Sequence, residues 1–285
     1  MPEGRAQRER AEALRRLHQG PRILILPNVW DVASARVVET AGFPALATTS
    51  AGVAFALGYP DGERITRDEM ASAVQRIVAR VRVPLSADME AGYGRAPEAA
   101  AQTARAVIAA GAVGMNLEDS TPDAPAVLFD ETLQAERIRA AREAADAAGV
   151  PIVVNARTDV FLRAIGEPET RLTHVVRRLN AYRAAGADCL FAPGVYDEET
   201  IGALVRAVGG PLNILAGRGC PPIPRLEALG VRRLSLGSGL MRATLGHVRR
   251  IAEELKGPGT FASILDAGVP THAEVTRLLG DDAST

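Results

Sequence analysis

Three carboxylates in two short segments could act together. Asp88 and Glu90 stand two residues apart in VPLSADME, and Glu118 stands in VGMNLED. Side chains two residues apart on a strand point to the same face of a sheet. Converging carboxylates repel one another unless a cation lies between them, and oxygen ligands without a nearby His or Cys suit Mg²⁺ or Mn²⁺. These residue types and spacings predict a metal site at Asp88, Glu90 and Glu118.

Arg157, in NARTD, could bind the carboxylate of a ligand, because its planar guanidinium offers parallel donors. An internal salt bridge to Glu118 or Asp159 is an equally good explanation, and it would still place Arg157 beside the carboxylates. The carboxylates also have a plainer explanation, in which Glu90 or Asp119 caps a turn or pairs with Arg157. We favour that explanation for one carboxylate alone and the metal site for three together.

Small and amide side chains add to this set. Ser50, with the backbone amides of Ala51 and Gly52, could cradle an anion, because small residues let backbone N–H groups approach a ligand. The alternative is a simple turn. Asn213 ends another apolar run, and we expect it to contact the substrate as well.

The elements that must position these residues alternate along the chain. Apolar runs of strand length, bounded by Gly and Pro, are typical of strands covered on both faces. Helical segments lie between them: Asp31 caps one, Thr66 and Glu69 form a capping box, and Pro97 stands in a first turn. The expected strands are 22–28, 45–50, 83–90, 113–119, 151–157, 187–194, 211–217 and 232–238.

Eight strand-and-helix units predict an α/β fold of the (β/α)8 barrel type, since an open doubly wound sheet usually has about five or six strands. We expect one domain over 1–285, with an N-terminal helix at 1–20, the barrel at 21–255 and a C-terminal helical extension at 256–285. The polar residues named above fall at the carboxyl ends of the strands, where the loops of such a barrel converge on one mouth.

Composition excludes several classes of protein. The 285 residues, 47% of them hydrophobic, can bury a core without disulfides. With 33 basic and 34 acidic residues, the chain has no excess positive charge for nucleic acid or an anionic membrane. The N-terminus is charged throughout, and no apolar run reaches the ~20 residues of a membrane span. Two cysteines fit a reducing compartment, so we expect a cytoplasmic protein.

The usual acid–base side chains are missing from the expected mouth. Cys189 lies inside a strand, and Cys220 lies near the mouth without a His or Lys partner in sequence, so neither is a favoured nucleophile. The histidines fall in predicted helices outside the barrel or in the extension, and we expect surface or packing roles for His18, His174, His247 and His272.

Five segments together resemble the isocitrate lyase/phosphoenolpyruvate mutase superfamily. They are PNVWDVASARVVETAGF, TSAGVAFALGYPD, DMEAGYG, NLEDS and NARTD, in order and with family-like spacing between about Pro27 and Leu245. The resemblance implies a (β/α)8 barrel that binds Mg²⁺ and a 2-oxo carboxylate. It also implies a homotetramer, a dimer of dimers, whose last helix swaps between subunits.

The resemblance implies roles for residues that match the motifs. Asp88 would ligate Mg²⁺ directly, and Asp61, Glu90 and Glu118 would hold its water ligands. Ser50–Gly52 would hold the substrate carboxylate. The other implied contacts are with the oxo and carboxylate oxygens, from Arg157, and with the wall beside the metal, from Trp30.

The common reaction of this superfamily passes through an enolate-type pyruvoyl intermediate, formed beside the carbonyl by cleaving or making a C–C or P–C bond. We expect Asp61 and Arg157 to take part in it, with the proton supplied by water or by Tyr93.

The departures from the family motifs concern the reaction type. The loop STPDAPAVLFDETLQ lacks the Cys of isocitrate and methylisocitrate lyases, and Pro193 stands where those lyases place a Glu. Ser120 replaces the first Lys of the mutase and phosphonopyruvate hydrolase motif. Glu90 gives Asp-x-Glu where many members have Asp-x-Asp. Classical isocitrate lyase and mutase activities are both disfavoured.

The expected function is therefore a Mg²⁺-dependent lyase acting on a small 2-oxo or 2-hydroxy di- or tricarboxylate, such as an oxaloacetate- or methylisocitrate-like compound. One alternative is P–C bond chemistry on a phosphonopyruvate-like substrate, with phosphate held near Gly217–Gly219 and Gly237–Gly239. A second alternative is a 2-oxo acid binding protein without catalysis.

Overall fold

The computed structural model describes residues 2–121, 124–266 and 268–280. Its main sheet has the order β1-β11-β10-β9-β8-β5-β4-β3-β2, with parallel neighbours. The strands of this sheet are β1 (Leu24–Leu26), β2 (Asn28–Val29), β3 (Leu46–Thr48), β4 (Leu85–Asp88), β5 (Gly114–Glu118), β8 (Val153–Arg157), β9 (Cys189–Phe191), β10 (Leu212–Leu215) and β11 (Arg233–Ser235).

The sheet closes into a barrel because its two end strands are consecutive pieces of one strand. β1 pairs with β11, β2 pairs with β3, and Pro27 separates β1 from β2. Proline has no backbone N–H to donate to a neighbouring strand, which accounts for the interruption. Each of the eight predicted strands is present in shortened form, and the predicted (β/α)8 barrel is confirmed.

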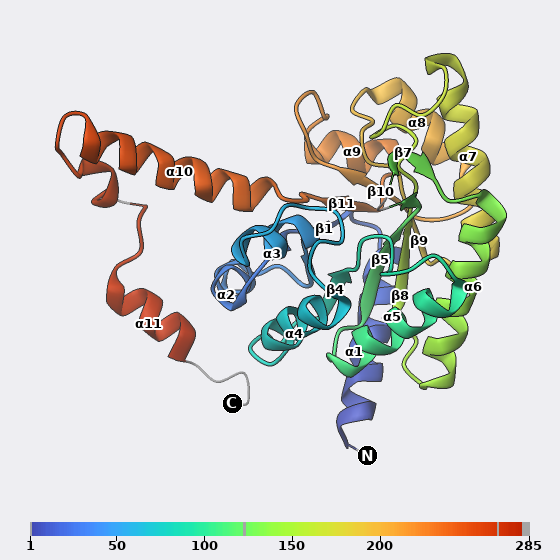
Figure 1. Cartoon of the computed structure of the whole chain (residues 1–285), viewed down its shortest axis with the longest axis horizontal. Helices are drawn as coiled ribbons and strands as arrows, with labels where there is room; N and C mark the ends of the chain where they lie inside the picture. The colour runs from blue at the N-terminus through green and yellow to red at the C-terminus, as the bar shows by residue number, and fades with distance from the viewer. Residues whose placement is uncertain (1, 122–123, 267, 281–285) are drawn as a thin grey trace.

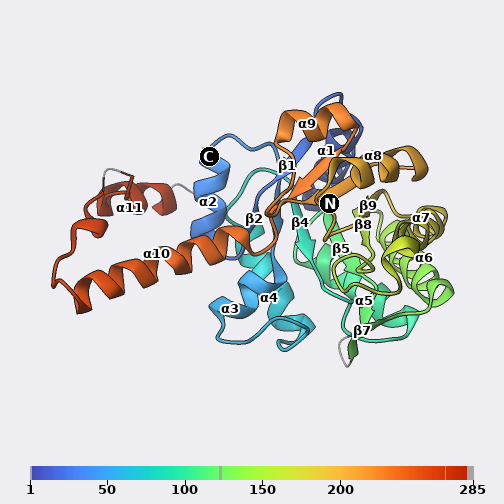
Figure 2. The same ribbon diagram turned by 90° about the horizontal axis from the view of Figure 1, so that it is seen from above.

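Helices surround the barrel (Figures 1 and 2). The expected helix starts are confirmed, since Asp31 accepts from Ser34 N at 2.7 Å, Thr66 Oγ1 accepts from Glu69 N at 3.2 Å, and Pro97 begins α5. The helices are α1 (Pro2–Gln19), α2 (Val32–Thr40), α3 (Ser50–Ala56), α4 (Arg67–Val78), α5 (Pro97–Ala109), α6 (Glu131–Ala147), α7 (Pro168–Ala184), α8 (Glu198–Ala207), α9 (Ile223–Leu229), α10 (Gly239–Lys256), η1 (Ala262–Ile264) and α11 (His272–Gly280).

A two-stranded antiparallel hairpin follows β5. It consists of β6 (Ser120–Thr121) and β7 (Ala124–Leu128). The hairpin occupies the start of the segment that lacks the lyase Cys. Residues 122–123 of that segment lie outside the described residues.

The N-terminal helix α1 closes the amino end of the barrel. Leu14 has no exposed surface, and Gln7 Nε2 donates to Ile108 O at 2.8 Å. A Cβ atom at position 114 would lie 3.0 Å from Leu14 Cδ2 and 2.9 Å from Ser86 Oγ. Glycine at Gly114 therefore lets the helix approach the strands closely. Of the helices described, none has the length and apolar character needed to cross a membrane.

The C-terminal helices leave the barrel. Figures 1 and 2 show α10 projecting away from it, and α11 returning toward α2. Arg36 Nε donates to Leu278 O at 3.1 Å, which joins α2 to α11. Met241, near the start of α10, is 7% exposed, whereas Val248 farther along the helix is 56% exposed and is not covered by this barrel. The expected bounds, a barrel at 21–255 and an extension at 256–285, stay a prediction.

Candidate active site

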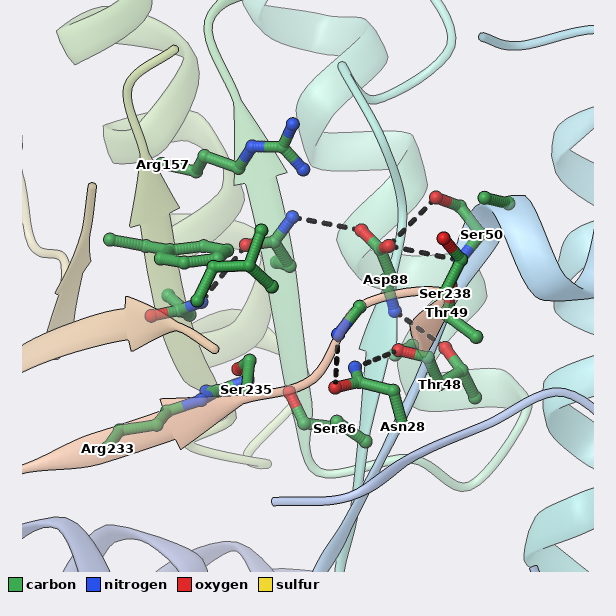
Figure 3. Close-up of a pocket in the computed structure, with 18 of the residues that line it drawn as sticks. Asn28, Thr48, Thr49, Ser50, Ser86, Asp88, Arg157, Arg233, Ser235 and Ser238 are labelled. Carbon is green, nitrogen blue, oxygen red and sulfur yellow. Dashed lines mark hydrogen bonds between the residues drawn. The ribbon is translucent and has the colours of Figure 1, made fainter. Parts of the chain in front are cut away.

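A cavity of about 190 Å³ opens at the carboxyl ends of the barrel strands (Figure 3). It lies where the barrel fold predicts chemistry. The side chains that line it are mostly polar, and come from eight different strand ends and loops. The lining residues are Asn28, Ala47, Thr48, Thr49, Ser50, Ala51, Asp61, Ser86, Ala87, Asp88, Asn116, Asn155, Arg157, Leu162, Phe191, Leu215, Arg233, Ser235, Gly237 and Ser238.

Asp88, the last residue of β4, is the best-held carboxylate in the cavity. Its Oδ2 atom accepts from Ser50 N at 3.0 Å and from Ser50 Oγ at 2.8 Å, and its Oδ1 atom accepts from Asn116 Nδ2 at 2.9 Å. Its own N–H donates to Thr48 Oγ1 at 2.8 Å. Ser50, expected to hold a substrate carboxylate, instead holds Asp88 in this structure.

Two asparagines extend this network at one depth of the barrel. Asp88, Asn116 and Asn155 are register partners on β4, β5 and β8. Asn155 Nδ2 donates to Asn116 Oδ1 at 3.0 Å. Because the Asp88 carboxylate only accepts hydrogen bonds, it sets the orientation of both amides. This amide relay, the hydrogen bonds from Asn155 to Asn116 and from Asn116 to Asp88, fixes the orientation of the Asp88 carboxylate, as a carboxylate that binds a ligand requires.

The neighbouring carboxylates are destabilised in their charged form. Burial, with further contributions from Asp88 and Asp61, raises the pKa of Glu90 to about 8 although Glu63 N donates to it. Burial raises the pKa of Glu118 well above its ordinary value despite Arg157. At the exposed rim, desolvation of the carboxyl group and then the Asp88 charge raise the pKa of Asp61. Carboxyl groups are therefore gathered around Asp88, and their mutual proximity and burial disfavour the charged form of each neighbour.

A divalent cation fits this arrangement as an ion held largely through water. No three His, Cys, Asp or Glu side chains within the described part of the chain lie close enough to hold an ion directly. Mg²⁺ commonly keeps several waters and uses one or two protein carboxylates. Asp88 faces the cavity, whereas Glu90 and Glu118 lie behind its surface. Glu90 Oε1 is buried without a hydrogen-bond partner, so it has a lone pair available for such a water.

The loop after β4 holds Glu90 in a strained backbone conformation. The φ angle of Glu90 is 49° and that of Tyr93 is 57°, both in the left-handed region. Non-glycine residues there cost about 1–3 kcal/mol, and such strain is concentrated at functional sites. The loop is tied to its neighbour by Glu63, whose N–H donates to Glu90 Oε2 at 2.5 Å and whose Oε1 accepts from Tyr93 N at 2.8 Å.

Arg157 lies at the opposite side of the cavity from Ser50 (Figure 3). Its Nε and Nη2 atoms donate to the two oxygens of Asp159 at 2.5 and 3.0 Å, and its Nη1 lies 2.8 Å from Glu118 Oε2. Both internal salt bridges that the sequence left open are therefore formed. Ser120 Oγ donates to Asp159 Oδ2 at 2.5 Å. Ser120, which replaces the mutase Lys, therefore helps to hold the carboxylate that pairs with Arg157.

A buried network behind Asp159 holds this side of the site. Asp119 Oδ1 accepts from Asp159 N at 2.9 Å, and its Oδ2 accepts from Tyr182 OH at 2.7 Å and from Arg178 Nη1 at 3.0 Å. Arg178 also donates to Phe129 O at 3.0 Å, beyond the end of the β6/β7 hairpin. Asp119 is a support for the site, since it has no exposed surface and does not line the cavity.

Several predicted site residues lie outside the cavity surface. Asn213 is fully buried, and its Nδ2 donates to Ser235 Oγ at 3.1 Å behind the cavity lining, so its expected contact with the substrate stays a prediction. Gly52 lies on α3, where a Cβ would meet Trp30 Cβ at 3.0 Å, so it serves close packing. Trp30 lines a separate hollow beside α3 and Leu279, and the expectation that it forms the substrate-side wall stays a prediction.

Tyr93 is also displaced from its expected place. It lines a hollow on the other side of the β4 loop, with Glu63 and Ile65, and not the cavity. Burial, followed by the charges of Glu90 and Glu63, raises the pKa of its phenol above the ordinary value. Its hydroxyl is buried beside Glu90 and outside the cavity, and the expectation that Tyr93 delivers a proton to substrate stays a prediction that this placement does not favour.

The cysteines take no part in the cavity, as expected. Cys189 has no exposed surface, and burial raises the pKa of its thiol to about 12. Cys220 is partly buried on the loop after β10 and burial raises its pKa as well. Neither thiol has the depressed pKa of a nucleophile.

Sequence reasoning missed the deeper polar residues of the cavity, Ser86 and Arg233. Ser86 precedes Asp88 by two residues on β4, and Arg233 precedes Ser235 by two on β11, so each lies one layer below a site residue on the same face. The signal that could have identified them is a polar or charged residue in the middle of a strand, with its side chain on the enclosed inner face of the barrel.

Comparison with known proteins agrees with the geometry. The family model for phosphoenolpyruvate phosphomutase matches residues 14–256. The chain belongs to the isocitrate lyase/phosphoenolpyruvate mutase superfamily. It is an enzyme of this superfamily, as the five motifs predicted.

Three relatives within the superfamily are similar over nearly the whole chain. A Burkholderia cenocepacia J2315 structure with a provisional lyase/mutase description is 42% identical, with a TM-score of 0.90 and 97% of each chain covered. The structure of a 2,3-dimethylmalate lyase is 31% identical, with a TM-score of 0.83 and 95% of each chain covered. An oxaloacetate decarboxylase of Bradyrhizobium sp. is 29% identical over 95% of this chain and 96% of its own length.

Proposed function

We propose that this superfamily member is a Mg²⁺-dependent lyase that cleaves a C–C bond of a small 2-oxo or 2-hydroxy di- or tricarboxylate through a pyruvate-type enolate. The observation that carries the proposal is the Asp88 carboxylate, held by three donors at the mouth of a polar cavity and facing Arg157. The names of two relatives, oxaloacetate decarboxylase and 2,3-dimethylmalate lyase, support C–C cleavage.

The residues divide between holding an ion and orienting the substrate. A bound divalent cation supplies Lewis acidity that stabilises negative charge developing on a carbonyl oxygen. Asp88 would hold it directly, and Asp61, Glu90 and Glu118 would hold its waters. Arg157 keeps N–H groups on Nη1 and Nη2 beyond those that meet Glu118 and Asp159, because a guanidinium carries five. These groups would orient a substrate carboxylate.

The proton that completes the reaction needs a donor within the cavity. Asp61 lines the cavity, and its raised pKa favours the protonated form relative to an ordinary Asp. A general acid works best when its pKa approaches the working pH. We therefore assign Asp61, acting directly or through one water, in place of Tyr93.

Phosphonate chemistry is a weaker alternative on this geometry. The backbone N–H groups of Leu236 and Gly237, where a phosphoryl group was expected, donate to Asn28 Oδ1 at 2.7 and 2.9 Å. Gly217 packs against Tyr196, with 2.6 Å from its ideal Cβ position to Cε1. These contacts leave fewer donors for a phosphoryl group. A silent 2-oxo acid binding protein, the second alternative, is disfavoured because the chain belongs to a superfamily of enzymes.

One panel separates these functions. We would assay oxaloacetate, 2-methylisocitrate, 2,3-dimethylmalate and phosphonopyruvate for keto acid release, with phosphate measured alongside. A C–C lyase releases keto acid without phosphate, and EDTA abolishes the release. Phosphate release would identify P–C chemistry. Mg²⁺-dependent pyruvate binding without product would identify the binding protein.

Asp88→Asn is the sharpest variant for this panel, since it keeps the shape of the side chain and removes its charge. We expect at least about a hundredfold loss of turnover, as for loss of an electrostatic group at the reacting centre. Asp146→Asn on the exposed face of α6 is the matched control. Unchanged turnover of Asp88→Asn would contradict the proposal.

We also propose that the chain assembles with copies of itself through α10, as a dimer of dimers. The support is the projecting helix (Figure 1) and its uncovered apolar side chains, among them Leu245 at 48% and Leu255 at 50% exposure. Contiguous exposed apolar surface of this kind marks interaction sites. Light scattering should report a tetramer, and Val248→Glu should shift it toward smaller species.

A further inference from the structure

The lower end of the cavity contains buried polar atoms for which the described residues provide no hydrogen-bond partner. Figure 3 shows Arg157 at the upper end and Arg233, with Ser86 and Ser235, at the lower end. Arg233 is 2%, Ser86 1% and Asn155 0% exposed. Arg233 Nε and Ser86 Oγ are buried there without a hydrogen-bond partner among the described residues, and so is Asn155 Oδ1 at the level of Asp88 and Asn116 in the same cavity. Buried polar atoms are normally satisfied, so three along one cavity indicate a ligand-binding subsite.

Three other arginines with little exposed surface each donate to carboxylate or carbonyl oxygens. Arg137, with no exposed surface, donates to Gln134 Oε1 at 2.9 Å and to Arg95 O at 2.7 Å, and also to the carbonyls of Gly94 and Ala91. Arg178 pairs with Asp119, and Arg157 pairs with two carboxylates. The fold therefore supplies acceptors to the guanidinium groups that it buries.

Arg233 is the exception. The contact recorded for its guanidinium is His18 Nε2, at 3.5 Å from Nη1. His18 Nδ1 lies 2.8 Å from Leu14 O, a contact that places the ring proton on Nδ1 and leaves Nε2 to face Arg233. Burial, and then the Arg233 charge, lowers the pKa of His18 to about 3, so the imidazole is neutral. A neutral ring at this distance does not offset a buried positive charge.

The remaining negative charge near Arg233 belongs to the opposite wall. Burial lowers the pKa of Arg233, and negative charge on Cys189 or Asp88 raises it. The Cys189 thiol is neutral because burial raises its pKa to about 12. The Asp88 carboxylate is already bonded to Ser50 and Asn116. A cation on Asp88 would cancel its attraction for Arg233, so loading the upper site increases the demand for an anion at the lower one.

We propose that Arg233 and Ser86 form an anion-binding subsite at the lower end of the cavity, which takes one compact monoanionic group such as a small carboxylate. Arg233 Nε–H and the Ser86 hydroxyl would donate to it. Asn155 Oδ1, held in place by the amide relay to Asp88, would accept from a water or hydroxyl beside it. The anionic group could come from a free ion in solution or from the second carboxylate of the substrate.

The free-ion source is tested on the metal-free, full-length protein without substrate, so it is independent of the proposed function. Thermal unfolding is followed in sodium formate and, at the same ionic strength, in sodium gluconate, which is too bulky for a subsite of this kind. Binding to the folded state should raise Tm saturably in formate only. The effect should vanish in Arg233→Met. Ser86→Ala should weaken formate binding by about tenfold, the loss expected for one hydrogen bond to a charged group.

Arg139→Met is the matched control, because it removes the same charge from an exposed position on α6, away from the cavity. This variant should respond to formate as the wild type does. Equal behaviour in formate and gluconate, or a formate effect that survives Arg233→Met, would count against the free-ion source. If Arg233→Met does not fold, crystals of the wild type soaked in bromide decide. An anomalous peak beside Arg233 Nε and Ser86 Oγ supports the subsite, and bromide found only elsewhere refutes a free-ion site.

The substrate source rests on the proposed function and is tested by binding as well as by turnover. Affinities for oxaloacetate analogues such as oxalate and malonate are compared with that for pyruvate in the Mg²⁺-loaded protein. If the second carboxylate occupies the subsite, Arg233→Met should weaken the dicarboxylates at least tenfold more than pyruvate. Equal weakening, together with no formate effect, overturns the proposal. Loss of turnover on every substrate with formate binding intact would refute only the proposed function.

Discussion

Two arginines line one cavity and differ in how their charge is met. Arg157, at the upper end, contacts Asp159 and Glu118 through Nε, Nη2 and Nη1, and the negative charge of both raises its pKa against the effect of burial. Arg233, at the lower end, has a neutral histidine at 3.5 Å, and burial lowers its pKa. The charge of the first guanidinium is balanced by carboxylates of the protein, whereas the charge of the second is left for a ligand to balance.

The difference shows that burial alone says little about a charged residue. A buried ion pair stabilises the fold only in comparison with a variant that lacks one of the two partners. In that variant the remaining charge stays buried without its counter-charge. A buried charge without a partner bears its desolvation cost unrelieved. Stability measurements can therefore separate the two arginines, independently of any activity assay.

The largest expected effect is on Arg157. Arg157→Met should lower the free energy of unfolding by about 3–5 kcal/mol, because it leaves Glu118 and Asp159 buried without their cation. Urea unfolding measures this directly. Arg163→Met is the control, since Arg163 lies 3.7 Å from Asp159 and 39% of its side chain is exposed, and it should change stability by less than about 1 kcal/mol. If Arg157→Met lowers the free energy of unfolding by less than about 1 kcal/mol, Glu118, Arg157 and Asp159 do not form a cooperative network.

The second effect concerns His18, beneath Arg233. The folded-state pKa of about 3 lies below the ordinary 6.5, so the unfolded chain binds the proton more tightly. Stability from neutral His18 is complete above pH 6.5 and is lost as the pH falls toward 3. Between pH 7 and pH 5 the loss should be about 2 kcal/mol. His18→Asn, which cannot titrate, should lack this part of the slope in unfolding measurements. Identical slopes would mean that His18 is solvated or charged in the folded protein.

A smaller effect is expected at the support of Arg157. Ser120→Ala removes the 2.5 Å hydrogen bond to Asp159 and should cost about 1 kcal/mol, because Arg157 still pairs with that carboxylate. Differential scanning calorimetry would register it as a drop in Tm. Ser72→Ala, which removes an exposed bond to Asp68 O, is the control and should be near neutral. A loss of several kcal/mol would mean that Ser120 holds the whole network together.

The smallest effect, and one of opposite sign, is expected for Arg233. In gluconate buffer, Arg233→Met should change the free energy of unfolding by less than about 1 kcal/mol or raise it, because it removes an unpaired buried charge while keeping most of the side-chain volume. Urea unfolding beside Arg157→Met gives the comparison. A loss as large as that of Arg157→Met would mean that Arg233 is already satisfied within the protein.

Much of the fold could be predicted from local pattern. Apolar runs bounded by Gly and Pro identified every barrel strand, and the caps at Asp31 and Thr66 identified helix starts, because both depend on neighbouring residues. The course of α10 could not be predicted. Its periodic apolar residues are the same whether the helix packs on its own barrel or on another surface, so sequence pattern does not distinguish the two.

The candidate site was predicted as a group and less well in detail. Asp88, Ser50, Asp61 and Arg157 line the cavity because they stand at strand ends or in adjoining loops that the closed barrel brings together. Tyr93 follows the same motif yet faces away, since the left-handed turns after Glu90 redirect the chain.

The sequence by itself determined which carboxylates could gather, because parallel strands that alternate with helices place their carboxyl ends at one mouth. Tertiary structure alone decided which charges are paired. Whether Arg157 or Arg233 meets a carboxylate depends on the register between strands that are distant along the chain and on the depth of each residue in the barrel. Pairing distances of about 3 Å are set by that packing, and no local pattern in the sequence encodes them.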